Sequence, residues 1–271
     1  MILFLLAGCV KQVDWPITNE SGNLIVVDAI LTNETKVQDV TITHPVANLN
    51  EAPVAVSGAN VIVSNEDSTW NLAEDSINPG IYSTPSTFSA IPGKNYSLLI
   101  YSQGKVYSAK AAMAPGAVFP ELHYSKNSDN DLYHIDFVAS AFTSGEPAMW
   151  EILIDWSKVP GYDALDPSLT RARLLFYSLK TLDVSEVFAP AVEKVSFPTS
   201  AEAGKQAVIE ERRYSLTPEH AEFIRTMLLE TNWQGGLFGS ASANVATNLS
   251  SGATGFFGVC AVNAISITVN P

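Results

Sequence analysis

The chain has 271 residues, enough for two domains of ordinary size, and 46% of them are hydrophobic, which is typical of a packed core. Asp and Glu (28) outnumber Lys and Arg (15), so the formal net charge is −13. A surface of this sign repels phosphate, which argues against nucleic acids and anionic lipid headgroups as partners.

The chain begins with a hydrophobic run, residues 1–8, that is too short to span a bilayer, which takes about 20 apolar residues. The run ends in small residues, as a secretory signal does before its cleavage site, although no Lys or Arg precedes it. The residues at this point resemble a bacterial lipobox: Leu6, Ala7, Gly8 and Cys9.

The lipobox resemblance implies that residues 1–8 are a signal peptide and that the thiol of Cys9 carries a diacylglycerol after cleavage. We therefore expect a lipidated tether over residues 9–19, because two or more acyl chains hold a protein stably on a bilayer. The alternative is an ordinary buried cysteine. An acylated Cys9 forms no disulfide, so Cys260 is predicted to be a small buried residue in a strand.

Short runs rich in Val, Ile and Tyr follow, separated by Gly, Pro, Asn and Ser. They predict strands at residues 24–31, 58–65, 95–102 and 105–113. Gln103 and Gly104 stand at the tip of a predicted hairpin. We interpret residues 20–114 as an immunoglobulin-like or prealbumin-like β-sandwich that ends near Pro115.

Residues 117–271 are predicted to form a second β-rich domain. In "WEILIDW" (150–156), apolar side chains share one face and Glu151 and Asp155 lie on the other, so we expect one buried and one largely wet face. The same alternation at residues 265–269 predicts a last strand inside a sheet. The fold class is therefore mainly all-β.

One segment of this second domain has helical periodicity and predicts a single helix at about residues 218–232. Thr217 is a good N-cap, and Pro218 occupies the first helical position, where its missing N–H costs nothing. Gly235 and Gly236 are predicted to end the helix.

Motifs for catalysis or metal binding are not found: the sequence contains no Gly-x-Ser-x-Gly, His-Glu-x-x-His or phosphate-binding glycine loop. The histidines are scattered at His44, His123, His134 and His220. His123 and His134 would converge if their strands pair, but a metal site would need further ligands. His220, in the first helical turn, is predicted to be polar and at the surface. We expect no enzyme, no metal and no cofactor.

Two charged stretches have simple interpretations. Asp129, Asn130 and Asp131 offer oxygen ligands for calcium, but the spacing of a calcium loop is missing, and a hairpin turn is favoured. The run from Glu210 to Arg213 is interpreted as a charged strand edge, since charge on an edge discourages strand addition.

Aromatic side chains in glycine-rich or acidic loops are the candidates for a ligand or partner surface: Tyr162, Trp233 and Phe238. Such residues are common in recognition surfaces. The alternative is that Trp233, at the end of the predicted helix, covers the core.

Several segments together resemble one protein family. They are the lipobox, "NLIVVDAILTN", "VSGANVIVSNEDSTWNL", "GIYSTP", "IPGKNYSLLIYSQGKVYSAKAAM", "SLTPEHAEFIRTMLLETNWQGGLF" and "GFFGVCAVNAISITV". Over nearly the whole mature chain they are similar to the Bacteroidetes lipoproteins grouped as domain-of-unknown-function 4249. The resemblance implies an outer-membrane lipoprotein at the cell surface, commonly encoded beside a TonB-dependent receptor, with no established enzymatic activity.

Three hypotheses about function follow. The first is an accessory partner of a TonB-dependent receptor, anchored through Cys9, that captures or admits a small-molecule, peptide or glycan nutrient. The second is a structural or adhesive β-sandwich protein of the cell surface without a transport role. The third is a hydrolase assembled from scattered residues such as His134 and Asp136.

Overall fold

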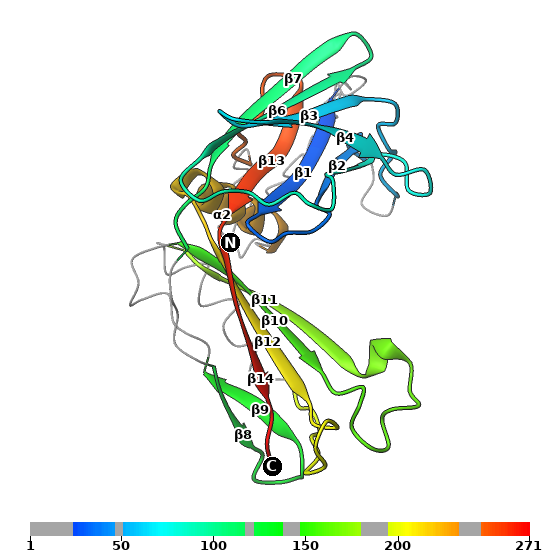
Figure 1. Cartoon of the computed structure of the whole chain (residues 1–271), viewed down its shortest axis with the longest axis vertical. Coiled ribbons are helices and arrows are strands. Elements are labelled where there is room, and N and C mark those ends of the chain that lie inside the picture. The colour runs from blue at the N-terminus through cyan, green and yellow to red at the C-terminus, as the bar shows by residue number, and fades with distance from the viewer. Residues whose placement is uncertain (1–23, 47–50, 117–121, 138–146, 180–194, 233–244) are drawn as a thin grey trace, which may run out of the picture.

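The computed structural model describes residues 24–46, 51–116, 122–137, 147–179, 195–232 and 245–271 (Figure 1). These residues form mainly β-strands, together with one α-helix, α2 (Pro218–Asn232), and a short 3-10 helix, η3 (Pro167–Leu169). The prediction of a mainly all-β fold that carries a β-sandwich and a helix is confirmed.

The first sheet contains eight strands in the order β13-β1-β2-β5-β4-β3-β6-β7. It bends on itself, so that β13, β1 and β2 face β3, β6 and β7 as two layers (Figure 1). The strands are β1 (Ile25–Thr32), β2 (Asp39–Thr43), β3 (Asn60–Ser64), β4 (Thr69–Glu74), β5 (Ile81–Ser83), β6 (Asn95–Ser102), β7 (Lys105–Ala112) and β13 (Ala253–Cys260).

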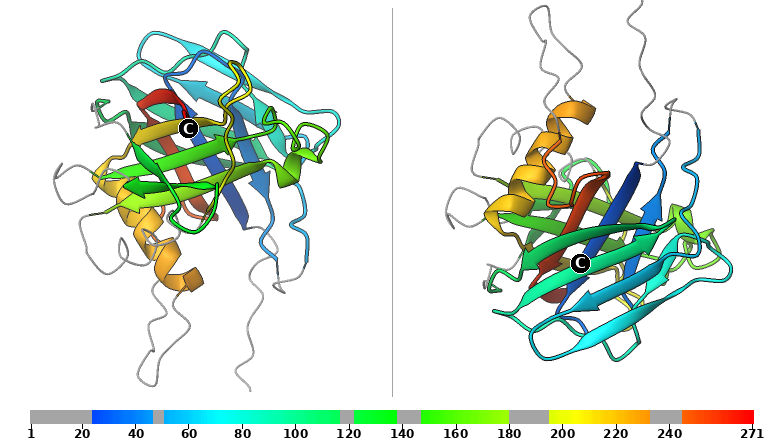
Figure 2. Two further views of the ribbon diagram at one scale, coloured as in Figure 1. Left: turned by 90° about the horizontal axis from the view of Figure 1, so that it is seen from below. Right: turned by 90° about the horizontal axis from the view of Figure 1, so that it is seen from above.

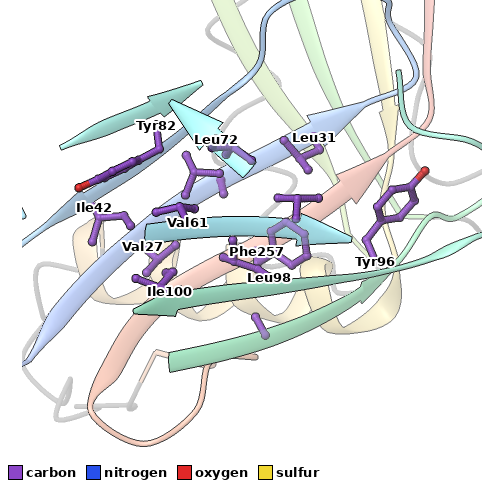
Figure 3. Close-up of a cluster of buried hydrophobic side chains, with 14 of the residues drawn as sticks. Val27, Leu31, Ile42, Val61, Leu72, Tyr82, Tyr96, Leu98, Ile100 and Phe257 are labelled. Atoms are coloured by element: carbon purple, nitrogen blue, oxygen red, sulfur yellow. The ribbon is translucent and has the colours of Figure 1, made fainter. Parts of the chain in front are cut away.

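Alternating side chains of both layers fill the space between them. Val27 and Phe257 come from one layer and Val61 and Leu98 from the other, and all four are fully buried (Figure 3). Each such side chain contributes about 1.5–3 kcal/mol through removal from water. The predicted hairpin between β6 and β7 is present, with φ of 49° at Gln103 and 75° at Gly104, since its two-residue turn needs positive φ.

Strand β13 lies far along the sequence from the strands that it joins. Residues 253–260 fall within the predicted second domain, yet β13 pairs in parallel with β1, from Ile25 opposite Ala253 to Thr32 opposite Cys260. Cys260 is fully buried in this strand, as predicted, and is a free thiol. The division near Pro115 therefore leaves β13 outside the sheet to which it belongs. A parallel pairing of such long range has no local sequence signal.

The second sheet contains four strands in the order β11-β10-β12-β14, and a two-stranded hairpin lies against it (Figure 1). Ile152, Ile154 and Ile209 of the sheet pack against Ile135 of the hairpin in a separate core. The strands are β8 (His123–Lys126), β9 (Tyr133–Phe137), β10 (Ala148–Asp155), β11 (Arg171–Ser178), β12 (Val208–Ser215) and β14 (Val262–Thr268).

Two predictions about charged residues in this sheet are wrong. β12 is no edge strand, because it lies between β10 and β14, and Glu211 and Arg213 are only 0% and 2% exposed. The second face of β10 was predicted to be largely exposed to water, but Glu151 on that face is only 5% exposed. Glu151 is buried beside opposite charges on neighbouring strands, Arg173 of β11 and Arg212 of β12, because buried charges need partners. The guanidinium of Arg213 lies over the ring of Trp150 on β10, 5.6 Å from the ring centroid.

The two sheets are joined by a continuous stretch of chain and by α2. A single residue, Ala261, separates β13 in the first sheet from β14 in the second. Helix α2 lies alongside β13, and the strands of the two sheets cross one another (Figure 2). Apolar side chains of α2, among them Ile224 and Leu228, pack with Tyr214 and Cys260, which come from different sheets.

A cluster of charged and polar side chains also connects the sheets: Glu34, Glu151, Arg173, Arg212 and Tyr214, here called the inter-sheet charge cluster. The carboxylate of Glu151 accepts hydrogen bonds from Arg173 Nε at 2.6 Å and from Tyr214 OH at 2.7 Å. Arg212 lies between Glu151 and Glu34, and Glu34 follows β1 of the first sheet. Burial raises the pKa of Glu151, but these hydrogen bonds and the Arg173 and Arg212 charges outweigh it, so the net pKa is lowered.

Candidate functional site

A groove lies where α2 meets the first sheet, with a cavity volume of about 590 Å³. The N-terminal turn of α2 forms one wall, β13 forms the floor, and the ends of β3, β6 and β7 form the other wall. We call it the junction groove. It is lined by Ser64, Asn65, Glu66, Asn95, Tyr96, Ser97, Lys110, Ala111, Ala112, Thr217, Glu219, His220, Asn248, Phe256, Gly258 and Val259.

The start of α2 is fixed by its cap. Thr217 Oγ1 accepts a hydrogen bond from the backbone N–H of His220 at 3.3 Å, and Thr217 O accepts one from Ala221 N at 2.9 Å. Pro218 is the first residue of the helix. The predicted N-cap and helix start are therefore confirmed, and together they place His220 on the side of the helix that faces β13.

His220 is only 2% exposed, so the prediction of a surface histidine is wrong. Its ring is stacked on Phe256 of β13, with ring centroids 4.6 Å apart, and Phe223, one turn further along α2, is stacked on the same ring at 4.9 Å. The sequence could not predict this burial, because the position of a polar residue in a first helical turn does not show which other element packs against that turn.

Gly258 makes room for this imidazole. A Cβ atom at position 258 would stand 2.6 Å from Cε1 and 2.8 Å from Nδ1 of His220, which is closer than non-bonded atoms approach. Its φ is not in the left-handed region, so the backbone itself does not demand a glycine here. The sequence therefore carries a glycine at 258 because the ring lies directly against the strand.

Nδ1 of His220 faces the thiol of Cys260, with a distance of 3.5 Å to Sγ. Burial lowers the pKa of His220 to about 4 and raises the pKa of Cys260 to about 12, so both groups are neutral at pH 7. A thiolate is the nucleophilic form of cysteine, so this buried pair is not poised for nucleophilic catalysis. A thiol that donates to Nδ1 leaves the imidazole hydrogen on Nε2.

Three groups in the groove remain available to a ligand. The structure gives no hydrogen-bond or ion-pair partner, among the residues that it describes, to Nε2 of His220, the ammonium of Lys110 or the carboxylate of Glu219. By contrast, the Asn248 amide is fully engaged. It donates to Lys110 O at 3.0 Å and to Phe257 O at 2.8 Å, and so bridges β7 to β13.

Residues 10–266 match the model of a protein family described as Domain of unknown function (DUF4249). This match covers nearly the whole chain. The chain belongs to the DUF4249 family. Comparison with curated proteins finds no match for it.

Several residues that the sequence singled out lie outside the described part of this DUF4249 chain. Leu6, Ala7, Gly8 and Cys9, the aromatic residues Trp233 and Phe238, and the predicted helix stop at Gly235 and Gly236 are among them. Tyr162 is described. It is partly buried and packs against the core of the second sheet, and it is not part of the junction groove.

His134 and Asp136 do contact each other, with 3.0 Å between Nε2 and Oδ1. The same carboxylate accepts a hydrogen bond from Ser125 Oγ at 2.5 Å, so Asp136 lies between the hydroxyl and the imidazole. A serine hydrolase needs the histidine in that middle position, where it can take the hydroxyl proton. The geometry does not provide that arrangement at His134.

The remaining motifs have structural roles in the described residues. β8 and β9 pair as an antiparallel hairpin, with His123 opposite Phe137 and His134 opposite Ser125. Asn130 in the connecting turn accepts a hydrogen bond from the backbone N–H of Leu132 at 2.8 Å, so the predicted hairpin turn is confirmed. The described residues contain no group of three or more His, Cys, Asp or Glu arranged to hold a metal ion. In that part of the chain, no helix is long and apolar enough to cross a membrane.

Proposed function

We propose that this DUF4249 chain is a lipid-anchored protein of the bacterial outer membrane that assists a TonB-dependent receptor in nutrient uptake. The observation that carries the proposal is the lipobox-like Leu6-Ala7-Gly8-Cys9 ahead of a chain that belongs to this family. In this proposal, the junction groove captures the nutrient on the exported side of the membrane. The Lys110 ammonium, the Glu219 carboxylate and Nε2 of His220, which have no partner among the described residues, support a binding role for the groove.

The anchor has a simple physical basis. Each methylene that an acyl chain buries in the bilayer contributes about 0.8 kcal/mol, and stable attachment takes at least two chains. A diacylglycerol on Cys9 supplies them. In this proposal, the tether over residues 9–19 connects the lipid anchor to the folded part, so that the folded part can contact a receptor in the same membrane.

A pull-down tests the partnership. The tagged, lipidated chain is purified in detergent from native outer membranes, and co-purifying proteins are identified by mass spectrometry. We expect a TonB-dependent barrel in amounts comparable to the bait. Repeated recovery of intact, lipidated protein without a barrel would contradict the proposal and favour the structural or adhesive alternative.

Substitution of Cys9 tests the anchor separately. We expect Cys9→Ala to move the protein from the membrane fraction to the soluble fraction, because no thiol remains to accept the lipid. The matched control is Cys260→Ala, which removes the other cysteine and leaves the lipobox intact. Membrane fractions are compared by immunoblot, and a Cys9→Ala protein that stays membrane-bound after signal cleavage would refute lipid anchoring.

A further inference from the structure

We propose that the junction groove binds a short peptide with free amino and carboxyl ends. This inference rests on the proposed function in nutrient capture and names its ligand class. It is carried by the charges and hydrogen-bonding groups that line one groove and have no partner in the described structure: the Lys110 ammonium, the Glu219 carboxylate and Nε2 of the buried His220.

A carboxylate fits the side of the groove where α2 begins. The first backbone N–H groups of a helix have no partner within the helix and carry partial positive charge, which favours an anion. The N–H of Glu219 is one of them, because Glu219 is the second residue of α2. The Lys110 ammonium lines the same groove and supplies a further donor, and so does Nε2 of His220 when the Cys260 thiol donates to Nδ1.

An amino group fits the acidic side chains of the groove. Glu219 and Glu66 both line it, and each presents a carboxylate to solvent. Glu66 already accepts hydrogen bonds from Asn95, at 3.3 and 3.4 Å, and from its own backbone N–H, so Glu219 is the carboxylate of the two that has no partner among the described residues. An ammonium group of a ligand beside the Glu219 carboxylate would gain a charge-assisted hydrogen bond.

The mixture of charges argues against a small ion of a single sign. A small anion would be repelled by two carboxylates, and a small cation would meet Lys110 and the positive end of α2. A molecule with opposite charges at its two ends satisfies both sets of groups. Between them the groove offers the hydroxyls of Ser64 and Ser97 for peptide amides and the apolar surface of Ala111 and Phe256. Its volume of about 590 Å³ is typical of small-ligand sites, which span roughly 300–1,000 Å³.

Titration calorimetry on the purified full chain in detergent tests the inference, with Ala-Ala-Ala and Ala-Phe-Ala as probes. The same peptides with an acetylated amino end and an amidated carboxyl end serve as ligand controls. We expect the free peptides to bind and the capped ones to bind at least about tenfold more weakly, because capping removes both charges.

Variants then locate the site. Lys110→Met and Glu219→Gln are each expected to weaken binding of the free peptides about tenfold. The matched controls are Lys105→Met on the same strand and Glu222→Gln on the same helix, since neither residue lines the groove. His220→Phe keeps a ring on Phe256 and removes Nε2, and it is used only if its circular dichroism matches the parent protein.

Absence of binding by either free peptide to folded protein would overturn the inference, as would equal losses in the groove variants and their controls. Capped peptides that bind as well as free ones would also overturn it. The receptor is not present in this experiment. A failed pull-down with intact peptide binding would therefore count against the receptor partnership alone, and the reverse result would count against the ligand class alone.

Discussion

At the scale of single residues, the His220 imidazole lies so close to Gly258 that no side chain fits between them. An added methyl group at 258 would have to displace the ring, whose Cε1 would be 2.6 Å away. Overpacking of a buried site costs about 1–3 kcal/mol. We therefore expect Gly258→Ala to lower the free energy of unfolding by that amount in urea titrations followed by circular dichroism.

A double-mutant cycle identifies the cause of that loss. In a His220→Ala background the space beside position 258 is empty, so Gly258→Ala should cost much less than in the parent protein. An equal cost in both backgrounds would show that the imidazole is not what the methyl group meets.

At the scale of elements, α2 depends on its cap for its position over β13. Thr217→Ala removes the acceptor of the His220 N–H, and loss of such a cap costs about 0.5–2 kcal/mol. We expect a decrease of this size in the free energy of unfolding, measured by denaturant titration. Thr217→Ser keeps the hydroxyl and should stay close to the parent value, so equal losses in both variants would contradict a capping role.

At the scale of the whole molecule, the inter-sheet charge cluster makes the free energy of unfolding depend on pH. Glu34 and Glu151 both have pKa values below their ordinary value of 4.5 in the folded protein. Hydrogen bonds and nearby positive charges, from Lys36 and Arg212 at Glu34 and from arginines at Glu151, outweigh the opposing effect of burial. A lowered folded pKa gives stability that is present above the unfolded pKa and is lost as the pH falls through the folded pKa. We therefore expect the free energy of unfolding to decline below about pH 4.5.

Glu151→Gln isolates the part that this cluster contributes. The variant has no carboxyl group to protonate at 151, so its unfolding free energy should decline less steeply between about pH 5 and pH 3 than that of the parent. Glu202→Gln, an exposed substitution outside the cluster, should leave the slope unchanged. Parallel slopes for Glu151→Gln and the parent would rule out the cluster as a source of acid sensitivity.

Features with local physical causes could be read from the sequence. Alternation of apolar residues marked β1, β6, β7 and β10, because a strand places successive side chains on opposite faces. Gln103-Gly104 marked a hairpin because both residues take positive φ, and Thr217-Pro218 marked the start of α2 because of their capping chemistry. The lipobox-like run ending at Cys9, and with it the proposed anchor, is also a property of the sequence alone.

Only the tertiary structure decided which segments far apart in the chain contact one another. The pairing of β13 with β1, the burial of Glu211 and Arg213 in a central strand, and the position of His220 between α2 and β13 are of this kind. Periodicity shows that a side chain shares a face with others, but not what covers that face. The sequence therefore contains no signal of the junction groove beyond His220 in a capped helix and Gly258 in a strand. The structural role of these two residues became clear only because the fold places the imidazole against the glycine.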